Sequence, residues 1–193
     1  MKAFVITRYK GPLRAADVAE PVVGDDDVLV QVHAAGLNQL DERIRLGEFK
    51  QILPYKLPLI LGNDLAGTVI NVGARVRGFK PGDEVYARPD KSRIGTFAER
   101  IAVGEGDLAL KPASISMAEA GSLPLVALTA WQALVERGKV ERGQKVLIHA
   151  GAGGVGSIAI QLARHLGASV ATTASASNAD FVRSLGADTV IDY

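Results

Sequence analysis

The stretch KVLIHAGAGGVG, residues 145–156, constrains the fold of this chain more than any other segment. Residues 146–148 are apolar and predict a short buried strand, and residues 157–167 carry apolar side chains at helical spacing. Four glycines lie between the two, at Gly151, Gly153, Gly154 and Gly156. A strand, a glycine turn and a helix form the context in which a G-x-G-x-x-G pattern indicates a dinucleotide-binding loop.

Each position of this turn has an expected task in such a loop. Gly151 is expected to allow the tight turn, Gly153 to let the backbone approach a pyrophosphate, and Gly156 to let the helix pack closely on the strand. The start of the helix then presents free N–H groups and the positive end of its dipole to the phosphates. The predicted cofactor-binding residues of the turn are Gly151, Gly153, Gly154, Val155 and Gly156. The alternative is a glycine-rich turn of an ordinary α/β domain.

Composition excludes several other classes of protein. The 193 residues include 22 Lys and Arg and 21 Asp and Glu, with no run of one sign, so we expect no nucleic-acid partner. No cysteine is present, which excludes disulfides, a thiolate metal site and a catalytic thiol. The longest apolar stretch, residues 123–135, is too short to span a bilayer. We therefore predict a cytoplasmic protein without a membrane partner.

The first part of the chain has the pattern of a β domain. Short apolar or alternating segments are separated by Gly, Pro and Asp, and residues 41–46 form the one expected helix. This texture favours a small, irregular barrel over βαβ units. The predicted strands are residues 2–8, 28–34, 62–72, 84–87 and 97–103.

The pattern changes near Pro112. Ser116 and Glu119 have the spacing of a capping box, and Pro124 suits the first turn of a further helix. From Lys145 onward the expected order is βαβαβ, one half of a doubly wound sheet. The sequence thus predicts two domains, 1–114 as a β domain and 115–193 as a partial dinucleotide-binding domain.

Segments along nearly the whole chain match one family in order. The chain resembles the zinc-independent medium-chain dehydrogenase/reductases, in their quinone oxidoreductase and enone reductase branch. The segments that carry the resemblance are HAAGLNQLDERIRLG (33–47), LPLILGNDLAGTVINVG (57–73), FKPGDEVYA (79–87), GSLPLVALTAWQAL (121–134), HAGAGGVGSIAIQLARHLGA (149–168) and SLGADTVIDY (184–193).

The resemblance implies a GroES-like β barrel followed by a Rossmann domain, with the active site in the cleft between them. It also implies that the sequence stops before the second βαβαβ half of the Rossmann sheet. The strand at residues 145–149 would then be an apolar edge, which predicts self-association. We therefore expect a homo-oligomer.

The cofactor is predicted to be NADPH. A Rossmann domain that prefers NAD has an acidic residue about 20 residues after the glycines, on the ribose hydroxyl. No acid occurs between Gly156 and Asp180 here, and the small hydroxyl residues 172–177 can donate to a 2′-phosphate. Ser175 and Ser177 are the candidates, and the resemblance adds Tyr193. The alternative for both serines is to cap the next helix.

The resemblance also supplies the candidate catalytic residues, Asn38, Asp41 and Thr129. Asn38 matches a position at the floor of the cleft, where its amide can donate to a developing enolate oxygen. Asp41 has an alternative as the N-cap of the short helix that follows it. Thr129 matches a threonine near the nicotinamide, and a core-facing place in its helix is the alternative.

Two functions follow as expectations. The first is transfer of hydride from NADPH to a quinone or an α,β-unsaturated carbonyl compound. No metal is expected, because Asn38 and residues 62–64 stand where alcohol dehydrogenases of the superfamily hold zinc with Cys and His. The second is a non-catalytic, NADPH-binding or self-associating chain that lacks the nicotinamide half.

Overall fold

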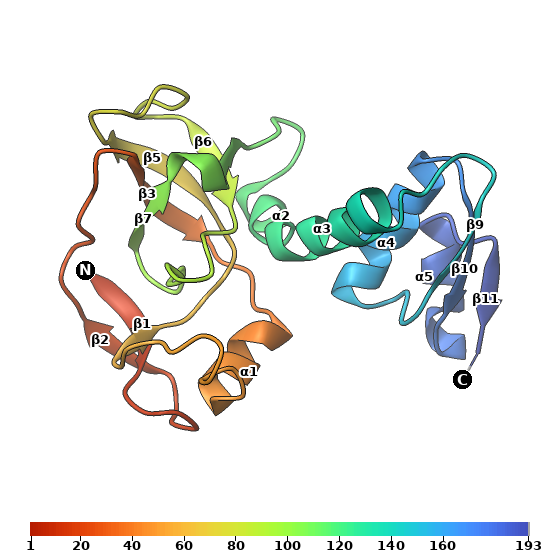
Figure 1. Ribbon diagram of the computed structural model, residues 1–193, viewed down its shortest axis with the longest axis horizontal. Coiled ribbons are helices and arrows are strands. Elements are labelled where there is room, and N and C mark those ends of the chain that lie inside the picture. Colours follow the sequence, from red (N-terminus) through yellow and green to blue (C-terminus); the bar gives the residue numbers. More distant parts are fainter. Residues whose placement is uncertain (193) are drawn as a thin grey trace. The chain divides into compact units, whose positions relative to one another are not determined.

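The computed structural model describes residues 1–192 and divides into two compact units, the first comprising Met1–Pro124 and the second beginning at Leu125. Each unit is described separately below (Figure 1). The boundary predicted after residue 114 assigns the next helix, α2 (Met117–Gly121), to the second domain. In the structure this helix packs on strands of the first unit.

The first unit is built around an antiparallel sheet with the strand order β7-β3-β5-β6-β8. Its strands are β3 (Asp27–Ala34), β5 (Leu65–Val72), β6 (Glu84–Ala87), β7 (Arg100–Gly104) and β8 (Leu108–Leu110). Alternate residues of the long strands point inward and form an apolar core, as the period of two requires. Fully buried members of this core are Val28, Val30, Leu65, Val69, Val85 and Val103.

A second, smaller sheet completes the unit with the order β2-β1-β4. It comprises β1 (Lys2–Ile6), β2 (Arg14–Asp17) and β4 (Leu59–Ile60). The helix α1 (Gln39–Leu46) begins two residues before its predicted start and buries Ile44 against Ile6 and Leu61. The segment between β7 and β8 is the short 3-10 helix η1 (Glu105–Asp107).

Four predicted strands of this unit have different bounds in the structure. β1 ends at Ile6 rather than at residue 8, and β3 begins one residue early, at Asp27. Residues 62–64 are not part of β5, which begins at Leu65, because Asn63 and Asp64 are occupied in side-chain hydrogen bonds described below. Residues 97–99 precede β7, although their backbone still bonds to Lys2 and to Leu61. The barrel pattern itself was predicted.

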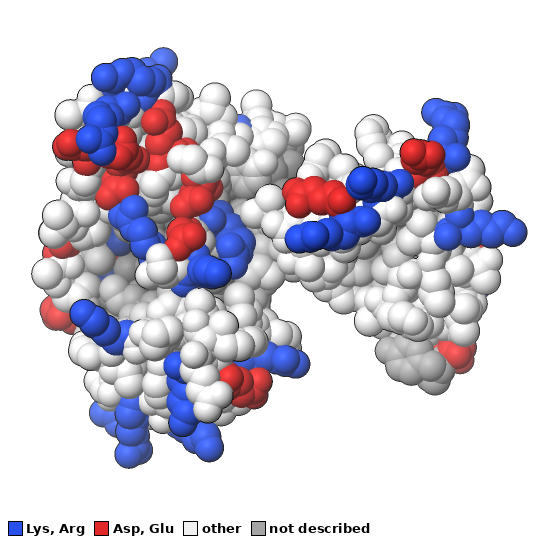
Figure 2. All heavy atoms as spheres, viewed as in Figure 1, with Lys and Arg blue, Asp and Glu red and all other residues white. Residues whose placement is uncertain are grey.

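Charged side chains of both signs are interspersed on the face of the first unit drawn in Figure 2. Several form ion pairs, among them Arg75 with Asp26, Arg93 with Asp27 at 2.7 Å, and Arg100 with Glu20 at 2.6 Å. The two terminal guanidinium nitrogens of Arg93 each donate to one carboxylate oxygen of Asp27, which is largely buried.

The helix α3 (Pro124–Trp131) starts at the last residue of the first unit, and its remaining residues and the π-helical segment η2 (Gln132–Arg137) begin the second unit. The parallel sheet that follows contains β9 (Lys145–Ile148), β10 (Ser169–Thr173) and β11 (Thr189–Ile191). Its order is β11-β10-β9, so β9 is an edge strand among the described residues, as predicted.

Helices cover this sheet in the predicted βαβαβ order. The helix α4 (Gly154–His165) packs on β9 and β10, and α5 (Ala179–Ser184) packs on β11 after the short 3-10 helix η3 (Ala176–Asn178). Ile160, Val170 and Val182 lie fully buried in the core between helices and sheet. No helix within residues 1–192 has the length and apolarity to cross a membrane.

Candidate functional site: a glycine loop and a buried polar cluster

The glycine loop connects the end of β9 to the start of α4, as the sequence predicts. Gly153 is the N-cap of α4 in an extended conformation (φ −80°, ψ 170°), and Ser157 N–H is bonded to Gly153 O at 2.9 Å. The first N–H groups of a helix have no acceptor within the helix. The loop therefore supplies several backbone donors at the positive end of the α4 dipole, an arrangement that suits phosphate.

Gly151 and Gly156 lie where neighbouring protein atoms leave no space for a Cβ. A Cβ on Gly151 would lie 2.1 Å from Thr172 Oγ1, and one on Gly156 would lie 2.3 Å from Ala150 O. The close packing expected at Gly156 is present. The tight turn expected of Gly151 is instead made by Ala150, which has a positive φ of 54°. Gly151 is needed because β10 lies against it.

Gly153 and Gly154 have more open surroundings. A Cβ on Gly153 would meet only Ala150 O, at 3.2 Å, and one on Gly154 would meet only Val126 Cγ1, also at 3.2 Å. Val155, the next residue of α4, is partly exposed. Since little protein fills the space beside Gly153, its glycine leaves room for a molecule that approaches the backbone.

Threonines at the end of β10 hold the glycine loop in place. Thr172 Oγ1 is buried and donates to Ile148 O at 2.7 Å, while Thr173 Oγ1 accepts from Ala150 N–H at 2.9 Å. The Gly151 N–H also bonds to Thr173 O at 2.9 Å. The sequence suggested these hydroxyls as phosphate donors. In the structure the two hydroxyls form hydrogen bonds with the end of β9 and with the glycine loop. The sequence does not show this role, because it depends on how β10 lies beside the loop in three dimensions.

Ser175 and Ser177 lie just beyond β10 and meet in space. Their hydroxyl oxygens are 3.1 Å apart, and Asn178 Nδ2 donates to Ser175 Oγ at 3.1 Å. Ser175 is the N-cap of η3, the next helix, although its side chain makes no capping hydrogen bond, so the capping alternative is correct in position for Ser175. It is wrong for Ser177, which lies inside η3, and the N-cap of α5 is Asn178. Tyr193, the third residue predicted here, lies outside the described residues. Asn178 is a polar neighbour that was not among the predicted site residues.

Asn38 and Asp41 lie at the start of α1 in the first unit. Asn38 is the N-cap, and its backbone N–H donates to Asp41 Oδ2 at 2.8 Å. The N-cap alternative for Asp41 is therefore wrong: Asp41 is the third residue of the helix and accepts a hydrogen bond from the cap. A carboxylate at this position satisfies a backbone donor and interacts favourably with the helix dipole.

The segment Gly62–Asp64 joins these two residues in a buried polar cluster, which consists of Asn38, Asp41, Asn63 and Asp64. Asn63 Nδ2 donates to Asp41 Oδ1 at 2.7 Å, and Asn38 Nδ2 donates to Asp64 Oδ2 at 2.8 Å. Asp41, Asn63 and Asp64 are buried. Burial raises the pKa of Asp41, and the hydrogen bonds from Asn63 and from the backbone of Asn38 and Gly62 partly oppose that rise.

Thr129 lies on α3 in the second unit. Its Oγ1 donates to Leu125 O at 2.7 Å, the usual bond of a helical threonine to the preceding turn. The side chain is exposed, so the core-facing alternative is wrong. No group of three or more His, Asp and Glu residues within residues 1–192 has an arrangement that suits a metal ion.

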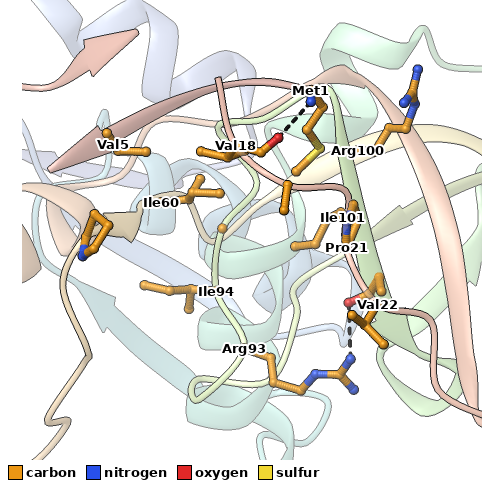
Figure 3. Close-up of a pocket in the computed structure, with 14 residues that line it drawn as sticks. Met1, Val5, Val18, Pro21, Val22, Ile60, Arg93, Ile94, Arg100 and Ile101 are labelled. Carbon is orange, nitrogen blue, oxygen red and sulfur yellow. Dashed lines mark hydrogen bonds between the residues drawn. The ribbon is translucent and has the colours of Figure 1, made fainter. Parts of the chain in front are cut away.

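A separate cavity of about 470 Å³ in the first unit contains none of the predicted residues (Figure 3). Its wall is mainly apolar, and its polar groups are engaged elsewhere. The Met1 ammonium donates to Val18 O at 2.8 Å, Arg93 pairs with Asp27, and Arg100 pairs with Glu20. The charged groups at the cavity wall are therefore already paired, and the rest of the wall is mainly apolar.

Comparison with known proteins gives consistent results for both units. The alcohol dehydrogenase GroES-like domain family matches residues 24–113. The chain is 45% identical to the NADPH-dependent alkenal/one oxidoreductase of Arabidopsis thaliana chloroplasts, over 100% of this chain and 52% of the relative. The chain spans about half the length of the curated relatives it matches.

Solved structures agree with this result. An alcohol dehydrogenase superfamily protein from Novosphingobium aromaticivorans has a TM-score of 0.94 at 46% identity, covering 100% of this chain and 58% of that protein. The quinone oxidoreductase of Coxiella burnetii has a TM-score of 0.92 at 39% identity, with coverage of 100% and 62%. The predicted fold class, a GroES-like barrel followed by the first half of a Rossmann sheet, is thus confirmed. The chain is therefore similar over its whole length to proteins named as quinone and alkenal/one oxidoreductases, and residues 24–113 belong to the alcohol dehydrogenase GroES-like domain family.

Proposed function

We propose that this chain binds NADPH and acts in the metal-free reduction of a quinone or an α,β-unsaturated carbonyl compound. The observation that carries the proposal is the form of the glycine loop. A Cβ on Gly151 or Gly156 would lie within 2.3 Å of protein atoms, whereas one on Gly153, at the N-terminus of α4, would meet a single protein atom at 3.2 Å. This is the arrangement that a pyrophosphate requires.

In this proposal the loop residues Gly151, Gly153, Gly154, Val155 and Gly156 hold the pyrophosphate. Ser175 and Ser177 bind the 2′-phosphate, with Tyr193 retained from the family resemblance. The hydroxyl pair beyond β10 and the absence of an acid before Asp180 support NADPH over NADH. NADPH supplies the hydride when it is bound.

The proposed catalytic residues are Asn38, Asp41 and Thr129. The Asn38 amide donates a hydrogen bond to the substrate oxygen that gains negative charge, and Asp41 holds the Asn38 backbone. Thr129 donates its own hydrogen to Leu125 O, so its oxygen is left as an acceptor. Water supplies the final proton. The proposal includes a cytoplasmic location and a small-molecule substrate.

Binding and turnover are tested separately. NADPH and NADH are titrated into the purified chain, and NADPH is expected to bind at least about tenfold more tightly, which corresponds to about 1.4 kcal/mol. Oxidation of NADPH is then followed with a quinone and with an enone. Equal affinity for both cofactors would contradict the 2′-phosphate site. Tight NADPH binding without turnover of either acceptor would support the proposed cofactor site and contradict the proposed catalytic function.

The alternative is a non-catalytic, NADPH-binding chain that self-associates. The observation that favours it is the edge strand β9, whose Leu147 is 53% exposed. Unpaired N–H and C=O groups on an apolar edge invite pairing with a second chain. Light scattering would show a mass above that of a monomer, which Leu147→Lys would reduce. A wild-type chain that stays monomeric at high concentration would exclude this alternative.

A further inference from the structure

The side-chain amide of Asn38 donates a hydrogen bond to the carboxylate of Asp64, a residue that is not among the proposed catalytic or cofactor-binding residues. Asp64 is 1% exposed, and its Oδ2 accepts from Asn38 Nδ2 at 2.8 Å. An ionised carboxylate can only accept hydrogen bonds, so it determines which end of the Asn38 amide faces it. The amide nitrogen is turned toward Asp64, and the orientation of the whole side chain is set.

The position of Asp64 is itself fixed by close packing. A Cβ on Gly36 would lie 2.6 Å from Gly121 O and 3.1 Å from Asp64 Cβ. The chain before Asn38 and the helix α2 therefore leave Asp64 little room to move. Asp41 holds the Asn38 backbone in parallel, and Asn63 holds Asp41. Two carboxylates from different segments thus fix the main chain and the side chain of one asparagine.

The Asn38 amide nitrogen carries two hydrogens, and the hydrogen bond to Asp64 Oδ2 uses one of them. Asn38 is only partly buried, in contrast to the three other residues of the buried polar cluster. We infer that Asp64 is a positioning residue, which orients Asn38 so that its second amide hydrogen is presented to the substrate oxygen that gains charge. This inference rests on the proposed function of Asn38.

The charge of Asp64 works against this task, because a carboxylate near a developing oxyanion repels it. Its contribution is therefore geometric, and the geometry can be separated from the charge. Asp64→Asn keeps an oxygen that accepts from Asn38 and removes the charge. Asp64→Ala removes the acceptor. We expect the first variant to retain the orientation of Asn38 and the second to lose it.

The first experiment observes the Asn38 side-chain amide directly in the isotope-labelled chain. Its two proton signals, assigned by their loss in Asn38→Asp, should be widely separated and exchange with solvent more slowly than those of Asn178. Asp64→Ala should bring the signals together and speed exchange, and Asp64→Asn should preserve them. Asp27→Asn, which alters another buried carboxylate of the same unit, should leave them in place.

Two results would overturn the inference at this stage. One is a wild-type Asn38 amide that exchanges as fast as that of Asn178, which needs no variant to fold. The other is an Asn38 signal that is unchanged in folded Asp64→Ala. Neither result depends on turnover, so this measurement decides the inference even if the chain proves inactive and the proposed reaction fails.

The second experiment uses the reaction. Asp64→Ala should lower kcat by about tenfold to a hundredfold, the cost of a misplaced group, without changing the KM for NADPH. Asp64→Asn should restore most of the activity. In an Asn38→Ala background, Asp64→Ala should have no further effect, because the residue acts through Asn38. An equal loss in both backgrounds would show that Asp64 is merely structural.

Discussion

At the scale of single residues, the glycines of the loop between β9 and α4 differ in how closely protein atoms would approach a Cβ at each position. At Gly151 and Gly156 a side-chain Cβ would lie 2.1 Å and 2.3 Å from protein atoms, whereas at Gly153 it would meet only Ala150 O, at 3.2 Å. The same substitution should therefore affect stability at some of these positions and ligand binding at others.

Gly151→Ala should destabilise the chain by about 1–3 kcal/mol, the usual cost of forcing an extra methyl group into a packed site. Gly153→Ala should destabilise the chain less than Gly151→Ala, because its one close contact is at 3.2 Å rather than 2.1 Å, and it should weaken NADPH binding. Urea unfolding and NADPH titration of both variants measure the two effects. Equal destabilisation by both would contradict the assignment, and Gly106→Ala, at an open position outside the loop, serves as the control.

Asp27 is a residue whose contribution to stability should depend on pH. Hydrogen bonds from Arg93 hold the pKa of Asp27 below its usual value, so the charged form is favoured in the folded state. The stabilisation is present above the unfolded pKa of about 3.9 and is lost as the pH falls through the folded pKa.

Asp27→Asn should lower the free energy of unfolding by about 1–2 kcal/mol at neutral pH, since Arg93 is half-exposed and solvent weakens the pair. The difference between wild type and variant should shrink as the pH falls below about 3.9. Urea unfolding at a series of pH values checks this. A difference that stays constant over the whole acid range would show that the ion pair is not its source.

The roles of Asn38 and Asp41 illustrate what sequence can give at this scale. The segment resemblance identified both residues, but the N-cap was assigned to Asp41 because Asp is a common cap at the start of a helix. The structure places Asn38 at the cap and Asp41 three residues later. The partners Asn63 and Asp64 come from a segment more than 20 positions away, and no local pattern predicts such a pairing.

At the scale of elements, local signals were sufficient where an element is stabilised locally. The capping box of α2 is present as predicted: Ser116 N–H donates to Glu119 Oε2 at 2.7 Å, and Glu119 N–H donates to Ser116 Oγ at 3.2 Å. The strands β2, β4 and β8 were not predicted. They have two to four residues each and are defined by pairing with distant strands.

Ser116→Ala should lower the free energy of unfolding by about 1 kcal/mol, because the cap loses the acceptor for the Glu119 N–H. Chemical unfolding of the variant measures this, and the exposed Ser114→Ala is the matched control on the preceding loop. A loss of the same size in the control would assign the effect to the loop rather than to the cap.

At the scale of the whole molecule, the order of elements was predictable because hydrophobic periodicity changes from two to that of helices near Pro112. The position of α2 was not, since its contacts with β3 and β5 rather than its sequence place it in the first unit. The predicted cofactor residues that the structure describes all lie in the second unit, so cofactor binding should act on the stability of that unit.

NADPH at about a hundred times its Kd should stabilise the second unit by about 2.7 kcal/mol, because a ligand that binds only the folded state shifts the unfolding equilibrium. Thermal unfolding of the chain with NADPH, with NADH and without cofactor measures the shift. NADPH should raise the midpoint more than NADH at the same concentration. A midpoint that neither cofactor changes would contradict nucleotide binding by this chain.

The threonine bonds at the end of β10 have a consequence for how the sheet assembles. Ile148 pairs with Thr172, and successive side chains of β10 point to opposite faces, so the Thr172 hydroxyl bonds to the end of β9 and the Thr173 hydroxyl bonds to the loop at Ala150. A slip of β10 by one residue would exchange the two faces. It would take the Thr172 hydroxyl away from its place beside Gly151 and Ile148 O, and it would leave the Ala150 N–H without its acceptor. The loop therefore acts as a check on strand register, and only the correctly paired sheet can form a nucleotide-binding turn.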